Sequence, residues 1–340
     1  MNCLKLAMLV TWREEGLWSL IKSLTERGNR VHVFQPLFSD PGISAPVRKF
    51  FKRTCELYLP MAALLTRKRF DVVLSWSMRM AVVYGILSRL SRGSSLPVHV
   101  MRDLHFNMER RDLMYRLRMA IFRMALPGID FFLCTSREEE RIYCEMFGIS
   151  PDRIAFFPDA PPDRFLSENV PCDKGQYIFS YGNSDRDFNT LIEAVRGSNI
   201  RCVILSQTFK PGNSLPENVI LLSSHIPEED IVRLIISSSL VVLPLKHYRV
   251  AAGQNTMLEA LALGHPLVVS ENFATCEYAQ HGVSAFFFRP GDVRDLKSKI
   301  QSVLESPDSA RQAGERGRNA VSELPGRQVS FLLDLLYRIL

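Results

Sequence analysis

Short runs of β-branched and aromatic residues alternate along the whole chain with longer segments of helical periodicity. This alternation predicts βαβ units and parallel sheets, because parallel strands are joined by long crossover connections that are usually helical. The strands predicted in the first half are residues 3–10, 30–35, 70–76, 97–101, 129–135 and 153–157. Those in the second half are residues 177–181, 201–206, 219–222, 240–244, 266–270 and 285–289. We therefore expect an α/β protein with two doubly wound, Rossmann-like sheets.

A proline-rich stretch separates the two series of strands. Residues 156–162, Phe-Phe-Pro-Asp-Ala-Pro-Pro, break both periodicities because proline lacks an amide donor and pushes its predecessor into extended geometry. A chain of 340 residues also exceeds the size at which single cores stop growing. We expect one domain over residues 1–160, a second over 161–325, and a helix over 326–340 that packs toward the first. The ligand-binding ends of the two sheets would face each other across a cleft.

Composition and cysteine usage exclude several classes of protein. The chain is 46% hydrophobic and 23% charged, which excludes disorder as its main state. Its longest apolar stretch, residues 231–245, contains Arg233 and is too short to span a bilayer. The first apolar segment, residues 4–10, has no cleavage site behind it and is interpreted as a strand rather than a signal peptide. Seven scattered cysteines without a C-x-x-C pair indicate free thiols, a cytoplasmic location and no metal site.

Positive charge is concentrated in less than a quarter of the chain. Between Arg48 and Arg123 there are 16 lysines and arginines against five acids, whereas the whole chain carries only +6. Residues 109–126 combine five arginines with eight large apolar residues, a composition typical of a helix at an anionic membrane surface. A crossover helix packed on its own sheet has the same composition. Basic clusters at residues 48–53 and 67–69 favour a peripheral position on the inner face of the membrane. No motif for nucleic-acid recognition accompanies the charge, so nucleic acid is not expected as a partner.

The most informative segment for chemistry is residues 243–270. It consists of a strand, a polar loop containing Gly253, a helix from about Asn255, a glycine stop at Gly264 and a second strand. Free backbone N–H groups at the positive end of this helix would hold phosphate oxygens. One turn into the helix, Glu259 could accept hydrogen bonds from the vicinal hydroxyls of a ribose. Glu259 could also be an acid on the helix surface, but this loop before it favours a nucleotide site.

Several motifs together resemble the retaining, GT-B type nucleotide-sugar glycosyltransferases of family 4. The motifs are Thr135-Ser136-Arg137-Glu138-Glu139, Phe157-Pro158-Asp159-Ala160-Pro161, Ser180-Tyr181-Gly182 with Arg186-Asp187, Ser224-His225-Ile226-Pro227-Glu228, and Pro290-Gly291-Asp292. The resemblance implies the GT-B fold and the transfer of a sugar from a UDP- or GDP-sugar to a glycan or lipid-linked acceptor. It further implies retention of configuration, with no stable metal and no other cofactor.

The resemblance also implies which residues hold the donor. The turn at Ile226 would meet the nucleobase, Glu259 the ribose, and the loop before the helix the phosphates. Arg186 would meet the diphosphate or lie in a solvated turn. Gly16 follows the first strand, where the family has a Gly-rich loop that faces the donor and the acceptor. The implied donor-binding residues are Gly16, Arg186, Ile226, Arg249, Gly253, Gln254, Asn255, Thr256 and Glu259.

Two residues of the first domain are candidates for catalysis. Asp103 and His105 follow a predicted strand at the edge where ligands are expected. Asp103 could act as a base on the acceptor, and His105 could polarise a sugar hydroxyl. Capping of the following helix by Asp103 is an equally supported interpretation.

One position departs from the family pattern. The family carries two glutamates separated by seven residues; the second falls on Glu259, but the first falls on Ala251. Ala252-Gly253-Gln254 resembles a variant branch in which this loop replaces the first glutamate, the one that touches the transferred sugar. Two alternatives therefore stay open. One is a GT-B epimerase that acts on the nucleotide sugar, and the other is a non-catalytic, nucleotide-binding protein that docks at membranes.

Overall fold

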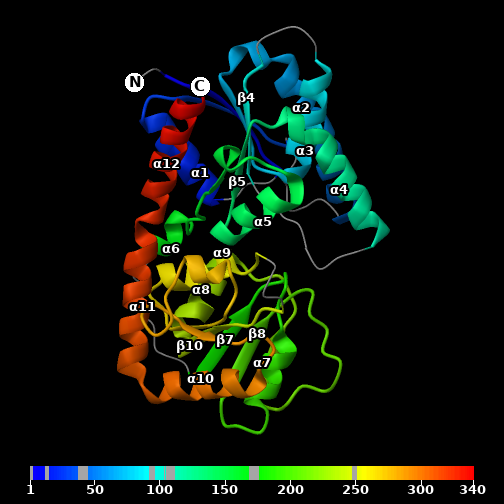
Figure 1. Ribbon diagram of the computed structural model, residues 1–340. Coiled ribbons are helices and arrows are strands. Elements are labelled where there is room, and N and C mark those ends of the chain that lie inside the picture. Colours follow the sequence, from blue (N-terminus) through cyan, green and yellow to red (C-terminus); the bar gives the residue numbers. More distant parts are fainter. Residues whose placement is uncertain are drawn as a thin grey trace. The chain divides into compact units, whose positions relative to one another are not determined.

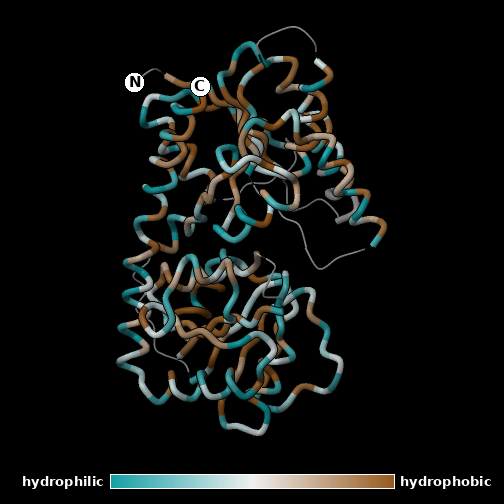
Figure 2. The backbone as a smooth tube through the Cα atoms, in the orientation of Figure 1, coloured by the Kyte–Doolittle hydropathy of each residue, from teal (hydrophilic) through white to brown (hydrophobic). Residues whose placement is uncertain are grey.

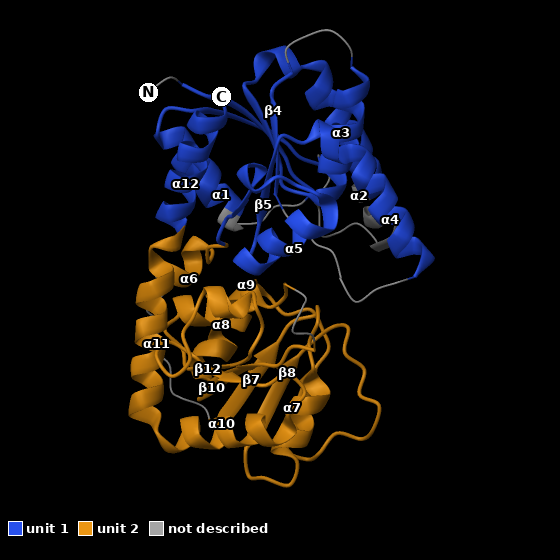
Figure 3. Cartoon of the chain, in the orientation of Figure 1, with its two compact units in different colours: residues 1–158, 325–340 blue, residues 159–324 orange. Residues whose placement is uncertain are grey.

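The computed structural model describes residues 3–11, 15–36, 45–91, 96–102, 104, 112–167, 176–246 and 251–340. The chain forms two compact units, one made of Met1–Pro158 with Pro325–Leu340 and the other of Asp159–Leu324 (Figure 3). Each unit contains one six-stranded sheet whose strand pairs are all parallel, with helices on its faces (Figure 1). The α/β class and the two Rossmann-like sheets predicted from the alternation are confirmed.

The sheet of the first unit has the strand order β2-β1-β3-β4-β5-β6. Its strands are β1 (Lys5–Leu9), β2 (Arg30–Phe34), β3 (Val72–Ser75), β4 (Val98–Arg102), β5 (Phe131–Cys134) and β6 (Ile154–Phe156). Its helices are α1 (Glu15–Glu26), α2 (Ala45–Leu65), α3 (Met78–Leu90), α4 (Leu113–Ala125), α5 (Arg137–Phe147) and α12 (Leu324–Ile339). Helices α1 and α12 cover one face of the sheet, and α2 and α3 cover the other (Figure 1).

The sheet of the second unit has the order β12-β11-β10-β7-β8-β9. Its strands are β7 (Tyr177–Tyr181), β8 (Arg201–Leu205), β9 (Val219–Leu222), β10 (Leu240–Leu243), β11 (Leu267–Ser270) and β12 (Phe286–Phe288). Its helices are α6 (Asp163–Ser167), α7 (Phe188–Val195), α8 (Glu228–Ser237), α9 (Gln254–Ala262), α10 (Val293–Glu305) and α11 (Pro307–Ser322). This is the Rossmann strand order, which reverses its direction of growth between β7 and β10.

The central strands are buried on both faces. All four residues of Val72–Ser75 in β3 and of Leu240–Leu243 in β10 are buried. Parallel sheets covered by helices on both sides require such continuous apolar runs, in place of the alternation seen in half-exposed strands. Figure 2 shows hydrophobic residues gathered along the strands of both sheets. The core of each unit therefore lies in two layers, one on each side of its sheet.

Helix α12 completes the core of the first unit although it follows the second unit in the chain. Five of its residues are buried together with apolar side chains of β1 and α1: Val329, Leu332, Leu333, Leu335 and Leu336. The side-chain amide of Gln328 also donates a hydrogen bond of 2.6 Å to the carbonyl oxygen of Pro158. The first unit is thus discontinuous in sequence.

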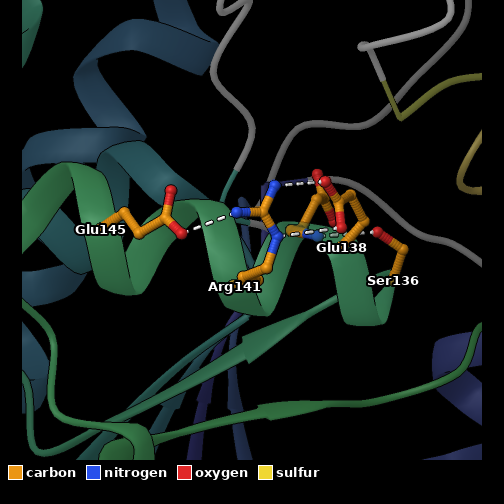
Figure 4. Close-up of polar contacts among 5 residues, drawn as sticks. Ser136, Glu138, Arg141 and Glu145 are labelled. Atoms are coloured by element: carbon orange, nitrogen blue, oxygen red, sulfur yellow. Dashed lines mark hydrogen bonds and ion pairs between the residues drawn. The ribbon is translucent and has the colours of Figure 1, made fainter.

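The turn between β5 and α5, one of the family-like motifs, is a helix cap. The hydroxyl of Ser136 accepts a hydrogen bond of 3.1 Å from the backbone N–H of Glu139, as expected of a serine at the N-cap. On the exposed side of the helix, Arg141 bridges Glu138 and Glu145, with N···O distances of 2.6 Å to each (Figure 4). Pairs at this spacing add modest helix stability. The residues of the Ser-containing motif therefore have a structural role, which is to begin and stabilise α5.

Candidate active site

Polar residues of the second unit gather where β7 and β10 end. Tyr181 is the last residue of β7, Arg186 lies in the loop that follows, and α9 begins at Gln254 after the loop that follows β10. Doubly wound sheets bind ligands outside the carboxyl ends of their strands, at the point where the strand order reverses. The reversal in this unit lies between β7 and β10. The candidate site therefore consists of Tyr181, Arg186 and the first turns of α9.

Arg186 joins the loop after β7 to the start of α9. Its Nε donates to the carbonyl oxygen of Tyr181 (3.0 Å), its Nη1 to that of Ser184 (2.6 Å), and its Nη2 to Oγ1 of Thr256 (2.8 Å). The residue is only 9% exposed, and burial lowers the pKa of its guanidinium to about 10. At neutral pH the side chain is thus a buried cation whose donors face oxygens of the protein. Arg186 and Thr256, both predicted as donor-binding residues, are brought into direct contact.

Two glycines are required by the close packing of these loops. Gly182 has a φ of +122°, and a Cβ at this position would lie 2.5 Å from Nη2 of Arg186. Gly253 precedes α9 with a φ of +87°, and its Cβ would lie 3.1 Å from both terminal methyl carbons of Leu245. A side chain at Gly182 would displace the guanidinium, and both φ values lie in the region that favours glycine.

The start of α9 offers backbone donors. The first N–H groups of a helix have no partner within the helix, and together with the helix dipole they favour an anion. In α9 these groups include those of Asn255 and Thr256, which with Gln254 were predicted to bind the donor. The Asn255 residue is exposed, whereas Gln254 and Thr256 are buried. This helix end can hold negatively charged oxygens.

Glu259 lies on the second turn of α9 and contacts β7. Its Oε2 accepts a hydrogen bond of 2.6 Å from the hydroxyl of Tyr181, which also lies 3.4 Å from the carbonyl oxygen of Thr256. Burial raises the pKa of the Glu259 carboxyl to about 7, against the opposite effects of the Tyr181 hydrogen bond and of the Arg164 charge. Within the described part of the chain, no group donates a hydrogen bond to Oε1. Oε1 can therefore accept hydrogen bonds from a ligand.

The remaining predicted site residues lie elsewhere or outside the described residues. Ile226, between β9 and α8, is half-buried and lines an open hollow of about 440 Å³ along α8. Gly16 lies in the first turn of α1, in the first unit. Arg249 and the two candidates for catalysis, Asp103 and His105, lie outside the described residues.

Histidine, cysteine and acidic side chains lie scattered over the described ranges. No three His, Cys, Asp or Glu residues gather there closely enough to hold a metal ion.

Tyr181 and Arg164 are site residues that sequence reasoning missed. Tyr181 was part of a family-like motif but had no role assigned to it. The signal that could have found it is its place as the last residue of a central strand, where a side chain can reach the ligand edge of the sheet. Arg164, in the short helix α6, pairs with Glu228 and its charge lowers the pKa of Glu259. No local pattern in the sequence indicates that contact.

Two protein families match the chain over most of its length. Residues 14–160 match the family described as Glycosyltransferase Family 4, and residues 173–320 match Glycosyl transferases group 1. The protein is a glycosyltransferase. No curated protein sequence matches this glycosyltransferase significantly. Of the three functions considered from the sequence, glycosyl transfer is the one that the family matches support.

Solved structures share the fold of this glycosyltransferase over nearly its whole length. A glycosyltransferase from Rickettsia africae is 13% identical, with 100% of this chain and 99% of that chain covered and a TM-score of 0.67. Sucrose-phosphate synthase from Thermosynechococcus elongatus is 16% identical, with 98% of each chain covered and a TM-score of 0.69. HepE from Anabaena, solved in complex with UDP-glucose, is 15% identical, with 97% and 99% covered and a TM-score of 0.65. At these identities the likeness establishes the GT-B fold.

Proposed function

We propose that this GT-B glycosyltransferase transfers a sugar from a UDP- or GDP-sugar to a glycan or lipid-linked acceptor, with retention and without a metal. The observation that carries the donor assignment is the cluster of Tyr181, Arg186, Thr256 and Glu259 at the reversal point of the second sheet. The ribose of a nucleotide presents two neighbouring hydroxyl donors, which match the free acceptor Oε1 of Glu259. The complex of HepE with UDP-glucose supports a nucleotide sugar as the donor class.

In this proposal the second unit holds the nucleotide and stabilises the nucleoside diphosphate as its bond to the sugar breaks. The N–H groups of Asn255 and Thr256 at the start of α9 bind the diphosphate, whose negative charge grows as the sugar leaves, and Gln254 is a further donor contact. Arg186 adds a buried positive charge beside them while its donors hold Thr256. Ile226, Gly253, Arg249 and Gly16 are proposed as further donor contacts, with Asp103 and His105 proposed to act on the acceptor.

A ligand screen tests the donor assignment. The enzyme is heated with UDP-glucose, UDP-N-acetylglucosamine, GDP-mannose or free nucleotides, and its melting temperature is compared with that of the free enzyme. A ligand at 100 times its Kd adds about 2.7 kcal/mol of stability, which is easily measured. We expect either uridine or guanosine nucleotides to stabilise the enzyme. The corresponding nucleotide sugar should release UDP or GDP when an acceptor is present. If no nucleotide or nucleotide sugar stabilises the enzyme at millimolar concentration, the donor assignment is wrong.

Transfer is expected to continue when divalent metal is removed. The reason is that the proposal stabilises the leaving diphosphate with helix-end N–H groups and a buried arginine. The measurement is the initial rate with excess EDTA, compared with the rate after magnesium or manganese is added back. Complete loss of activity that either metal restores would contradict metal-free transfer.

We also propose that the first unit docks on an anionic membrane surface through α4. Five large apolar residues of this helix are between 39% and 78% exposed: Leu113, Met114, Leu117, Ile121 and Met124. At 3.6 residues per turn they fall within an arc of about 100°, so they form one exposed apolar stripe. The buried side of α4 is narrow, with only Phe122 and Ala125 fully inside. A crossover helix packed on its own sheet does not require such a stripe.

The charges on α4 favour an anionic lipid surface as its partner. Arg116, Arg118 and Arg123 are exposed, and the helix sequence Leu113–Ala125 contains no acid. In projection down the helix, Arg118 lies on one side of the apolar stripe and Arg116 and Arg123 on the other. This is the geometry of a helix that lies in the membrane interface, with apolar side chains among acyl chains and cations at the headgroups. None of the helices in the described residues has the length and apolarity needed to cross a bilayer.

Neutralising two arginines of α4 is expected to release the enzyme from anionic vesicles. Each cation near the surface contributes about 1 kcal/mol, so Arg116→Gln with Arg118→Gln should weaken binding roughly thirtyfold. Co-sedimentation with phosphatidylglycerol vesicles at low salt measures this effect, which should shrink as salt screens the charges. The control is Arg201→Gln with Arg294→Gln, which changes the net charge equally at exposed positions of the second unit. Equal binding by the two double variants would reject α4 as the docking helix.

A further inference from the structure

Hydrogen bonds fix Tyr181 at its backbone and at its hydroxyl. It lies beside Glu259, the residue proposed to accept hydrogen bonds from the ribose. Its carbonyl oxygen accepts the hydrogen bond from Nε of Arg186, and its hydroxyl donates to Oε2 of Glu259 at 2.6 Å. Its ring stacks on that of Phe179, with centroids 5.2 Å apart and planes within 13°. Tyr181 is only 6% exposed. The hydroxyl is therefore fixed in space with little freedom to turn away from the carboxylate.

The same contacts form a closed ring between β7 and α9. Arg186 links Tyr181 to Thr256, and Thr256 and Glu259 lie three residues apart on α9, so they share one side of the helix. The hydrogen bond from Tyr181 to Glu259 closes the ring. Within this ring Oε2 is directed at Tyr181, which leaves Oε1 as the acceptor for a ligand.

We propose that Tyr181 is the positioning residue of the donor site: its hydroxyl holds Glu259 in the ionised form that binds the ribose, so donor affinity follows the ionisation of Glu259. This inference deepens the proposed function and rests on the assignment of Glu259 to the donor site. Tyr181 itself does not contact the donor in this scheme, because its hydroxyl is already bonded to the carboxylate. It acts through Glu259.

The charged and polar groups around Glu259 determine whether loss of the Tyr181 hydroxyl raises or lowers its pKa. Among the described residues these groups come from four places: Tyr181 on β7, Arg186 in the loop after it, Arg164 on α6 and Glu228 on α8. Burial, the largest effect, raises the pKa of Glu259; the Tyr181 hydrogen bond and the two arginines lower it, Glu228 raises it, and the resulting pKa is about 7. A hydrogen bond to the ionised form favours that form. Removing the Tyr181 hydroxyl should therefore raise the pKa further and leave Glu259 neutral at physiological pH.

The first test observes Glu259 directly and needs no ligand. The enzyme is labelled with ¹³C at the glutamate carboxyl carbons, and the Glu259 signal is assigned as the one missing from Glu259→Gln. The titration midpoint is then compared between the parent enzyme and Tyr181→Phe. We expect a parent midpoint well above the usual glutamate value, and a rise of about one pH unit in Tyr181→Phe.

A matched control tests whether loss of any tyrosine hydroxyl from this strand would shift the titration midpoint of Glu259. Tyr177 lies on the same strand, and its hydroxyl donates to the carbonyl oxygen of Leu234 at 2.9 Å. Tyr177→Phe therefore loses a comparable hydrogen bond away from Glu259, and its Glu259 midpoint should equal that of the parent. The inference is overturned if Tyr181→Phe has the parent midpoint, or if both variants shift equally.

The second test measures donor affinity against pH by calorimetry, with UDP-glucose and GDP-mannose as probes. Both phosphates of these molecules are esterified, whereas the terminal phosphate of a free nucleotide would itself titrate near pH 6. With a carboxyl pKa of about 7, affinity of the parent should fall about tenfold between pH 8 and pH 6. In Tyr181→Phe the fall should occur at higher pH, and in Glu259→Gln affinity should not depend on pH.

The outcomes of the two tests distinguish this inference from the proposed function. Donor binding that is independent of pH in the parent enzyme overturns the inference and leaves the proposed function intact. Failure of every nucleotide sugar to bind overturns the proposed function, and the carboxyl titration still decides whether Tyr181 controls the ionisation of Glu259. A shifted midpoint without any change in the pH profile of binding would also overturn the inference, because donor affinity would not follow the ionisation of Glu259.

Discussion

Glu259→Gln is expected to weaken binding of the nucleotide-sugar donor by about tenfold to a thousandfold. The substitution keeps the size of the side chain but removes the charged acceptor that faces the ribose. Hydrogen bonds to charged groups contribute roughly 1.5–3 kcal/mol each and neutral ones about 0.5–1.5 kcal/mol, so loss of the charge at two ribose hydroxyls costs about 2–3 kcal/mol. The measurement is the Kd of the stabilising nucleotide sugar by calorimetry at pH 8, where a carboxyl with a pKa of about 7 is mostly ionised.

A second glutamate of the same unit provides the control for this variant. Glu193, on α7, pairs with Arg196 at 2.8 Å on an exposed surface. Glu193→Gln removes the same charge and should leave donor affinity unchanged. An unaltered Kd in Glu259→Gln, in a protein whose melting curve shows an intact fold, would refute the role of Glu259.

Gly314→Ala is expected to destabilise the second unit by about 3 kcal/mol or more. Gly314 lies on α11 where this helix packs against the end of α9, and a Cβ there would overlap the carbonyl oxygen of Gly264. The atoms that it would meet are backbone, so no side chain can turn aside, and the two helices must move apart. For a unit of this size, the melting temperature should fall by roughly 6–12 °C in differential scanning calorimetry.

Gly326→Ala is the matched control, because Gly326 is also helical and a methyl group added there would meet no atom within 4 Å. Alanine is favoured over glycine inside helices by up to about 1 kcal/mol, so this variant should melt at the parent temperature or above it. Equal melting temperatures of Gly314→Ala and the parent enzyme would show that α11 and α9 can separate at little cost. Such a result would contradict the close helix contact described here.

The fold could be predicted because parallel strands leave a strong local signal. Each of the twelve predicted strands coincides with an observed strand, and the ends agree within two residues. Runs such as Val72–Ser75 and Leu240–Leu243 are buried throughout because helices cover both faces of their sheets. The predicted helix start near Asn255 lies one residue from the observed start at Gln254.

The contacts of the site could not be predicted, because they depend on the order of strands in the sheet. The sequence indicated Glu259, but its partner Tyr181 lies 78 residues earlier and meets it only because β7 pairs with β10. Arg186 was expected to meet a diphosphate or to lie in a solvated turn. Its guanidinium is buried, which excludes the solvated turn, because Gly182 leaves room for it beside the start of α9. Such close packing has no periodicity that a sequence pattern could reveal.

The place of α12 in the first unit has a consequence for synthesis of the enzyme. A ribosome must translate the 166 residues of Asp159–Leu324 between the rest of this unit and its last helix. At about 5–20 residues per second, that interval lasts roughly 8–33 s. During it the apolar residues Leu17, Leu20 and Leu24 of α1 lack the partners that α12 later supplies. Aggregation and chaperone binding of the nascent chain should therefore depend on how quickly the second unit is translated.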